Sequence, residues 1–114
     1  MGIRYGLFFL LLLAAPSLAA QQISLDSMMR LEKRYLKEDS VRAKLLNDIA
    51  RRYYTVNPRE GVRYAEQAIA LGEKLSDKKF LAGAYSAMGS NRLSMADYPA
   101  ALDNYQKALD INQR

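Results

Sequence analysis

Apolar residues return every three or four positions along most of the chain, which is the period of an α-helix with one buried face. The pattern predicts five helices, at about residues 25–37, 41–55, 58–75, 78–95 and 98–111. We find no run of strict period-two alternation, which would indicate a half-buried strand. The sequence therefore predicts an all-α fold.

Each predicted helix has apolar positions on one side and most have a recognisable start. The positions expected to face the core in the first three are Leu25, Met28, Met29, Tyr35 and Leu36, then Leu46, Ile49, Ala50 and Tyr53, then Val62, Ala65, Ala68 and Ile69. The expected N-caps, whose side chains can accept bonds from first-turn amides, are Ser24, Asn57, Asp77 and Asp97. Asn57 is followed by Pro58 and by Glu60 at capping-box spacing, which predicts a sharp helix start.

The last four predicted helices divide into two similar halves. The stretch PREGVRYAEQAIAL (58–71) aligns with YPAALDNYQKALDI (98–111) at an offset of 40, and the helices before them align at an offset of 39. Ala68 then pairs with Ala108, and Ala50 with Gly89. A helix-turn-helix unit repeated in this way is expected to stack, each helix packing on the one before it.

The second unit, AYSAMGSNRLSMADYPAALDNYQKALDI, resembles a tetratricopeptide repeat, with Tyr85 ahead of Met88 and Gly89. Its second helix has Tyr98, Ala101, Tyr105, Ala108 and Leu109 at that family's spacings. The first unit departs from the pattern, with Pro58 and Ala65 where the family has aromatic residues. Its long second helix resembles the longer version of the repeat found in exported bacterial proteins and in sensor regions of bacterial signalling proteins.

This resemblance implies a short α-solenoid of two stacked repeats, residues 40–77 and 78–114, preceded by one extra helix within residues 21–39. The expected packing positions between and within the repeats are Ala50, Ala68, Tyr85, Gly89, Tyr98, Ala101, Tyr105 and Ala108. The small residues would let helices approach closely, and the tyrosines would fill the space beside them.

The resemblance also implies a binding groove along the first helices of the repeats. Its expected lining is Lys44, Asn47, Arg51 and Tyr54 from the first unit and Gly83, Ser86, Ser90 and Leu93 from the second. The first set suits a peptide backbone and a carboxylate, whereas the second set is small and would leave space. The alternative is that Lys44 and Arg51 only solvate a helix face, while Tyr54 packs against the N-terminal helix.

The first 20 residues have the pattern of a secretory signal peptide. Arg4 precedes the apolar residues 6–15, Pro16 ends that run and small residues follow, so cleavage is expected after Ala19 or Ala20. An uncleaved membrane anchor is the alternative, although Pro16 interrupts the apolar run well before the ~20 residues that a span needs. We therefore expect export to the periplasm or the extracellular space, and a membrane location only if the signal is retained or the chain is part of a longer, anchored protein.

The chain has no cysteine and no histidine. It therefore has no disulfide, no thiol nucleophile and no lipidated cysteine, and it lacks the usual general base and zinc ligand. We expect a protein without catalysis, metal or cofactor. A hydrolase would have to use scattered carboxylates such as Asp48, Glu60 and Asp103, which have no recognisable acid-base spacing.

The charge is moderately basic, +5 in total. Residues 21–63 hold ten basic and six acidic side chains, and residues 64–114 hold six of each, with no dense Lys/Arg run. Nucleic acid is therefore not an expected partner. The main expectation is an exported module that binds a peptide or partner protein, with acidic peptides favoured.

The alternative function is that of the N-terminal periplasmic sensor segment of a longer, membrane-anchored histidine kinase or transcriptional regulator. Two repeats are fewer than the three or more that a solenoid normally needs. The last helix would also leave Tyr105, Leu109 and Ile111 uncovered.

Overall fold

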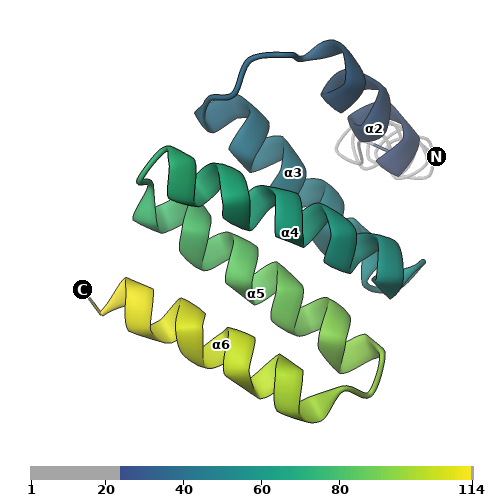
Figure 1. Ribbon diagram of the computed structural model, residues 1–114. Coiled ribbons are helices and arrows are strands. Elements are labelled where there is room, and N and C mark those ends of the chain that lie inside the picture. The colour runs from purple at the N-terminus through teal and green to yellow at the C-terminus, as the bar shows by residue number, and fades with distance from the viewer. Residues whose placement is uncertain (1–23, 114) are drawn as a thin grey trace, which may run out of the picture.

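Residues 24–113 are described by a computed structural model and form five helices with no strand (Figure 1). The helices are α2 (Leu25–Arg34), α3 (Ser40–Tyr53), α4 (Pro58–Lys74), α5 (Lys78–Ser94) and α6 (Tyr98–Asn112). The expectation of an all-α fold is confirmed for this part of the chain, whereas the expected signal peptide lies outside it. Within residues 24–113, no helix has both the length and the apolar run that crossing a bilayer requires.

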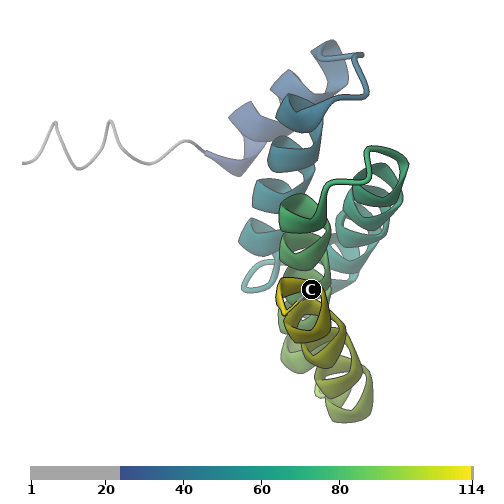
Figure 2. The ribbon, with the colours of Figure 1, turned by 90° about the vertical axis from the view of Figure 1, so that its left-hand side faces the viewer.

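Successive helices run in opposite directions and form a row from α2 to α6 (Figure 1). Helix α5 has the most neighbours in the row, because it contacts α3, α4 and α6, whereas α2 contacts α3 alone among the described helices. In the second view, α4 lies beside α3 on the side away from α2 (Figure 2). The helices that begin the two units, α3 and α5, are therefore direct neighbours.

The core lies where α3, α4 and α5 meet. Its fully buried members include Leu46 and Ile49 of α3, Ala65 of α4 and Ala84 of α5. Small side chains on α4 and α5 allow these helices to pack closely, so that larger residues from α3 can fill the space between them. The predicted inward-facing residues of α3 and α4 are confirmed as members of this core or packed against it.

Short polar side chains start every described helix. The predicted caps Ser24, Asn57, Asp77 and Asp97 each accept a bond from a first-turn amide, and Asp39 does the same for α3. Only the Asn57 half of the predicted capping box forms, because the Asn57 N–H donates to the Tyr53 carbonyl oxygen and the Glu60 carboxylate accepts from Arg63, 2.7 Å away. Pro58 occupies the first turn of α4, where its missing N–H costs nothing.

Helix α2 ends at Arg34, three residues before its predicted end. Arg42 of α3 donates to the carbonyl oxygens of Glu32 and Tyr35 and pairs with the Glu32 carboxylate, which draws the chain away from the helix. Leu36 then lies in the connecting loop and is 84% exposed, so its predicted place in the core is wrong. The helical period no longer applies once the helix has ended.

A buried asparagine joins three helices. Asn91 of α5 is 0% exposed and donates from Nδ2 to the carbonyl oxygens of Ala50 (2.9 Å) and Ala87 (2.8 Å). Ala50 lies in the last turn of α3, where carbonyl groups lack helical partners. Gly61 of α4 closes against the same amide, since a Cβ there would lie 1.8 Å from Asn91 Oδ1.

The predicted stripe of tyrosines and alanines on α6 divides between two neighbouring faces. Ala101 and Ala108 are buried, whereas Tyr98 is 64% exposed, so its predicted packing role is wrong. Ala101 and Ala108 each follow a tyrosine by three positions. This spacing rotates each alanine by about 60° around the helix axis from its tyrosine and separates the two sets. Tyr105 lies between these faces, with its ring over Gly89 of α5.

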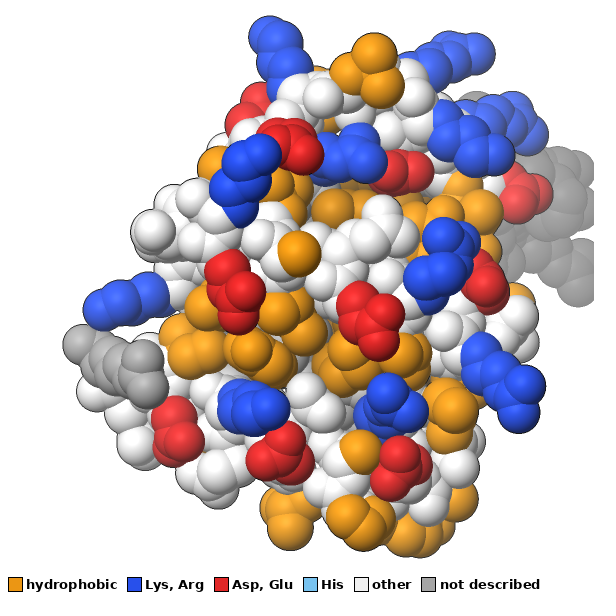
Figure 3. Space-filling model, viewed as in Figure 1, with side chains coloured by type: hydrophobic (Ala, Val, Ile, Leu, Met, Phe, Trp, Pro, Cys, Tyr) orange, Lys and Arg blue, Asp and Glu red, His pale blue; other side chains and the backbone are white. Residues whose placement is uncertain are grey.

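Apolar side chains therefore remain exposed along α6, and Figure 3 shows them at the lower edge of the molecule. Tyr98, Leu102, Tyr105 and Leu109, which we call the α6 stripe, carry this surface. Ile111 was expected there but is half-buried, facing a hollow lined by Gly72 and Leu81.

Candidate binding groove between α3 and α5

Two adjoining hollows, of about 280 and 290 Å³, lie along the line where α3 and α5 pack together. The first is lined by Lys44, Asn47, Asp48, Arg51, Lys79, Phe80 and Gly83. The second is lined by Arg51, Tyr54, Ser86, Ala87 and Ser90. Because Arg51 borders both, we treat them as one surface and call it the α3–α5 groove.

Most of the side chains expected from the sequence to form a groove are brought together here. They are Lys44, Asn47, Arg51 and Tyr54 on α3 and Gly83, Ser86 and Ser90 on α5. Leu93, the remaining expected residue, is exposed near the end of α5 and lines neither hollow. The spacing of these residues, three or four apart on each helix, explains why they share one face.

Arg51 lies at the middle of the groove. Its guanidinium extends over α5, where a Cβ on Gly83 would lie 3.5 Å from the Arg51 Nη2 atom. No acidic side chain among the described residues pairs with Arg51. Its forked donors are thus available to a ligand, and such donors match the two oxygens of a carboxylate.

Asn47 forms the floor of the first hollow and is only 6% exposed. Its Nδ2 donates to the Phe80 carbonyl oxygen in the first turn of α5, at 3.1 Å, so the side chain ties the two helices together. Its Oδ1 is buried and has no hydrogen-bond partner among the described residues. A buried acceptor without a partner is energetically costly, so the tie to Phe80 is formed at some cost in stability.

Two exposed lysines line the mouth of the first hollow. Lys44 is exposed and pairs with Asp48 one turn along α3, at 2.8 Å. Lys79 of α5 is exposed and forms no ion pair with another described residue. Sequence reasoning missed Lys79, although it lies four residues before Gly83 and hence on the same face of α5.

The second hollow has a mixed lining of hydroxyl and aromatic groups. Tyr54 remains half-exposed at its edge, whereas its neighbour Tyr53 is the tyrosine that meets α2, donating to Met29 Sδ at 3.0 Å. The alternative in which Tyr54 packs on the N-terminal helix is therefore wrong. Ser90 shares a hydroxyl hydrogen bond of 2.9 Å with Tyr105, so α6 supports this end of the groove.

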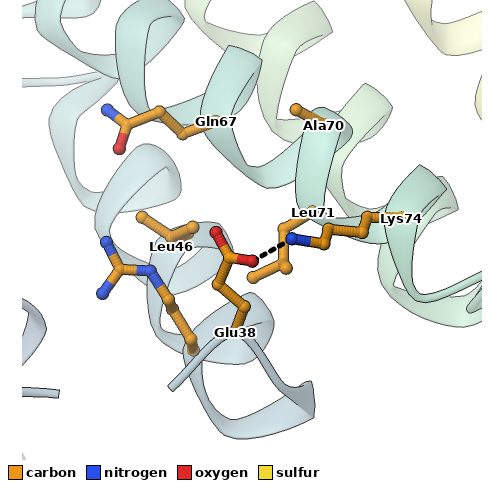
Figure 4. Close-up of a pocket in the computed structure, with 7 residues that line it drawn as sticks. Glu38, Leu46, Gln67, Ala70, Leu71 and Lys74 are labelled. Carbon is orange, nitrogen blue, oxygen red and sulfur yellow. Dashed lines mark hydrogen bonds and ion pairs between the residues drawn. The ribbon is translucent and has the colours of Figure 1, made fainter. Parts of the chain in front are cut away.

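A third hollow, of about 240 Å³, lies between α4 and the segment from residue 38 to α3 (Figure 4). Glu38 and Lys74 point toward one another and form an ion pair across its mouth, with Leu46 and Leu71 behind them. Lys74 lowers the pKa of the Glu38 carboxyl, mainly through their hydrogen bond. Glu38 and Lys74 already pair with one another. We therefore interpret this hollow as a contact between α4 and the segment before α3, and not as a binding site.

A fourth hollow lies on the face shown in Figure 3, between the end of α4 and α6. Tyr85, predicted as a packing residue, is half-buried on its wall, and the Lys107 ammonium lies 5.6 Å from the centre of its ring. Asp103 raises the pKa of Lys107, through a hydrogen bond and its charge. The Lys107 ammonium is therefore already engaged by Asp103.

The carboxylates considered for hydrolysis lie apart. Asp48, Glu60 and Asp103 belong to three different helices, and each pairs with a basic residue of its own helix. Residues 24–113 contain no group of three or more potential metal ligands of the His, Cys, Asp and Glu types. These three carboxylates are therefore paired with bases of their own helices and not with one another.

Comparisons of the chain with protein-family models, with curated proteins and with solved structures give no match. The function of the α3–α5 groove must therefore be inferred from its own residues.

Proposed function

We propose that this protein is a non-catalytic binding module that holds an extended, carboxylate-bearing peptide in the α3–α5 groove. The observation that carries the proposal is the position of Arg51, which borders both hollows and has no acidic partner among the described residues. An unpaired guanidinium between two hollows suits a ligand that brings a negative charge.

The groups around Arg51 add charge and shape the groove. Lys79 adds a second cation at the mouth of the first hollow, and Asn47 forms its floor. In the second hollow, Ser86 and Ala87 leave room for a ligand side chain beside Tyr54. A short peptide with an acidic side chain or a free C-terminal carboxylate fits this combination.

The helix arrangement supports the interpretation as two tetratricopeptide-like repeats, α3 with α4 and α5 with α6. Helix α5 packs on both helices of the first unit, as expected where stacked repeats share an interface. We propose that the first helices of the repeats form a concave binding face and that the module is exported after cleavage near Ala19 or Ala20. Groups of this kind need no cofactor.

A second candidate is that the described helices are the sensor segment of a longer signalling protein. The α6 stripe favours it, because no other described element covers Tyr98, Leu102 or Leu109. A further helix packed there would bury these side chains as α5 buries the equivalent face of α4. Partner binding in the α3–α5 groove is compatible with both candidates.

Peptide capture followed by titration tests the proposed groove. Peptides ending in glutamates with a free carboxylate should bind, and their amidated, glutamine-substituted counterparts should bind more weakly. Replacing Arg51 by Gln removes charge-assisted bonds and should weaken binding by roughly tenfold or more. Binding should also weaken with salt, since partly exposed charges are screened beyond about 10 Å at 0.1 M.

The matched control is Arg52→Gln, which makes the same change one residue away on α3, at an exposed position outside both hollows. Arg92 is a poorer control because it lies 3.7 Å from Asp97, the cap of α6. If Arg51→Gln and Arg52→Gln bind the acidic peptide as tightly as the unmodified chain does, the groove is not a carboxylate site. Arg51 would then only solvate the helix.

A further inference from the structure

The outer side of α2 and the loop after it combine unpaired cations with exposed leucines. The residues concerned, which we call the α2 surface, are Arg30, Leu31, Lys33, Arg34, Leu36 and Lys37. We propose that the α2 surface docks the protein on a bilayer that contains anionic phospholipid. This role is independent of the peptide proposed for the α3–α5 groove.

The placement of these residues follows from how α2 packs. Its buried residues Met28 and Glu32 face α3, which is the helix that α2 contacts. Arg30 and Arg34 fall on the opposite side of the helix and Leu31 on the flank beside Arg34, since each residue turns by about 100°. Figure 3 shows hydrophobic atoms between Lys and Arg side chains along the upper edge of the molecule, over this region.

The cations of the α2 surface are not neutralised within the described part of the protein. Arg30, Lys33, Arg34 and Lys37 are exposed, and none of them forms an ion pair with another described residue.

Of the acids closest along the chain, Asp26 in the first turn of α2 is exposed without an ion pair to a described residue, and the other three are already engaged. Glu32 is buried against Arg42, Glu38 pairs with Lys74, and Asp39 accepts from Tyr35 and from backbone amides of α3. Positive charge is therefore concentrated on this side of α2.

The exposed apolar groups distinguish a lipid surface from other anions. Leu31 and Leu36 each expose more than half of their area, as does Val41 at the start of α3. Ammonium and guanidinium groups can bind lipid phosphates while the leucines enter the boundary between headgroups and chains. The α6 stripe lacks this combination, since Asp103 and Asp110 are its nearest charges on the exposed side of α6.

Vesicle sedimentation with the full chain tests the proposal. Residues 6–15 are apolar and would bind any bilayer, so the readout is the ratio of binding between two kinds of vesicle. One kind is phosphatidylcholine alone, and the other is phosphatidylcholine mixed with phosphatidylglycerol. Each cation near an anionic surface contributes about fivefold, so Arg30→Gln with Arg34→Gln should lower the anionic preference on the order of twentyfold.

The matched control is Arg59→Gln with Lys78→Gln, which removes the same charge from exposed positions at the starts of α4 and α5. This pair should retain the preference for anionic vesicles. Equal losses from both pairs would mean a general effect of net charge and would overturn the proposal. So would equal binding of the unmodified chain to both kinds of vesicle.

A second variant separates lipid from other polyanions. Leu31→Ser with Leu36→Ser changes only exposed side chains, so the fold should persist, and binding to anionic vesicles should fall severalfold. If this variant binds anionic vesicles as well as the unmodified chain does, while single-stranded DNA competes for the same cations, the α2 surface is a site for polyanions and not for lipid.

Discussion

At the scale of single residues, two buried asparagine side chains connect α3 and α5. Asn91 ties α5 to the last turn of α3, and Asn47 ties α3 to the first turn of α5. Both have a buried Oδ1 with no hydrogen-bond partner. The two side chains differ in position, because Asn91 closes on Gly61, whereas Asn47 lies at the floor of the α3–α5 groove. The first is therefore a packing contact between helices, and the second supports the groove from beneath.

Gly61→Ala tests the packing contact. In an ordinary helix interior this change stabilises by roughly 0.5–1 kcal/mol. Here the new Cβ would lie 1.8 Å from Asn91 Oδ1, so we expect the free energy of unfolding to fall by about 1–3 kcal/mol, measured by denaturant unfolding.

The control is the same change in an Asn91→Ala background, which removes the obstructing amide. There Gly61→Ala should be neutral or stabilising, with a coupling energy of about 0.5–3 kcal/mol between the two sites. If the effects of the two substitutions on the free energy of unfolding were additive, the proposed contact would be contradicted.

At the scale of elements, the sequence predicts helix starts better than helix ends. The caps Ser24, Asn57, Asp77 and Asp97 could be recognised because each acts within its own first turn. The end of α2 could not, because it depends on Arg42, which lies ten positions after Glu32 and reaches back from the next helix. For the same reason the sequence placed Leu36 in the core, although it lies in the loop.

The stability of the junction between α2 and α3 should fall at acidic pH. Asp39 caps α3, and the Tyr35 hydroxyl donates to it at 2.6 Å, while the amides of Val41 and Arg42 donate to its other oxygen. The Tyr35 hydrogen bond is the largest cause of a lowered pKa at Asp39, below its ordinary value of 3.8. The same bond raises the pKa of Tyr35.

The unfolded carboxyl takes up its proton before the folded one does as the pH falls. The stability that Asp39 contributes is therefore complete above about pH 4 and is lost as the pH falls through the lower folded pKa. Denaturant unfolding between about pH 5 and about pH 2 should show a steeper loss for the unmodified chain than for Asp39→Asn, which keeps a capping side chain without a titrating group. Parallel pH profiles would contradict this account of the junction.

At the scale of the whole molecule, the helical period predicted the order of helices, and the resemblance implied most of the groove lining. Lys44, Asn47, Arg51, Ser86 and Ser90 lie together as the resemblance implied, because their spacing places them on one face of each helix. Long-range contacts could not be found in this way. Nothing in the helical pattern identifies Asn91 as a buried polar residue. The exposure of Tyr98 depends on how α6 packs on α5.

The α6 stripe gives a prediction about assembly. Leu102 and Leu109 are at least half-exposed, so replacing both with Gln should change the free energy of unfolding by no more than about 0.5 kcal/mol for each residue. If the stripe mediates association, the same variant should remain monomeric in light scattering at concentrations where the unmodified chain associates. Leu46→Ala, at a fully buried position, is the contrasting change and should cost about 2–5 kcal/mol. A large loss of stability in the α6 variant would show that the stripe is part of the core.

The measurement that tests the central claim most directly is a titration of the isotope-labelled protein with an acidic, free-carboxylate peptide, followed by amide NMR spectra. Binding in the α3–α5 groove predicts that the largest shifts fall on the Asn47 side-chain amide, the Arg51 guanidinium and the backbone amides of Gly83 and Ser86. Signals from Leu102 and Leu109 of the α6 stripe should remain in place. Shifts concentrated on α6 or on α4, or no shifts at peptide concentrations that saturate capture, would contradict the account.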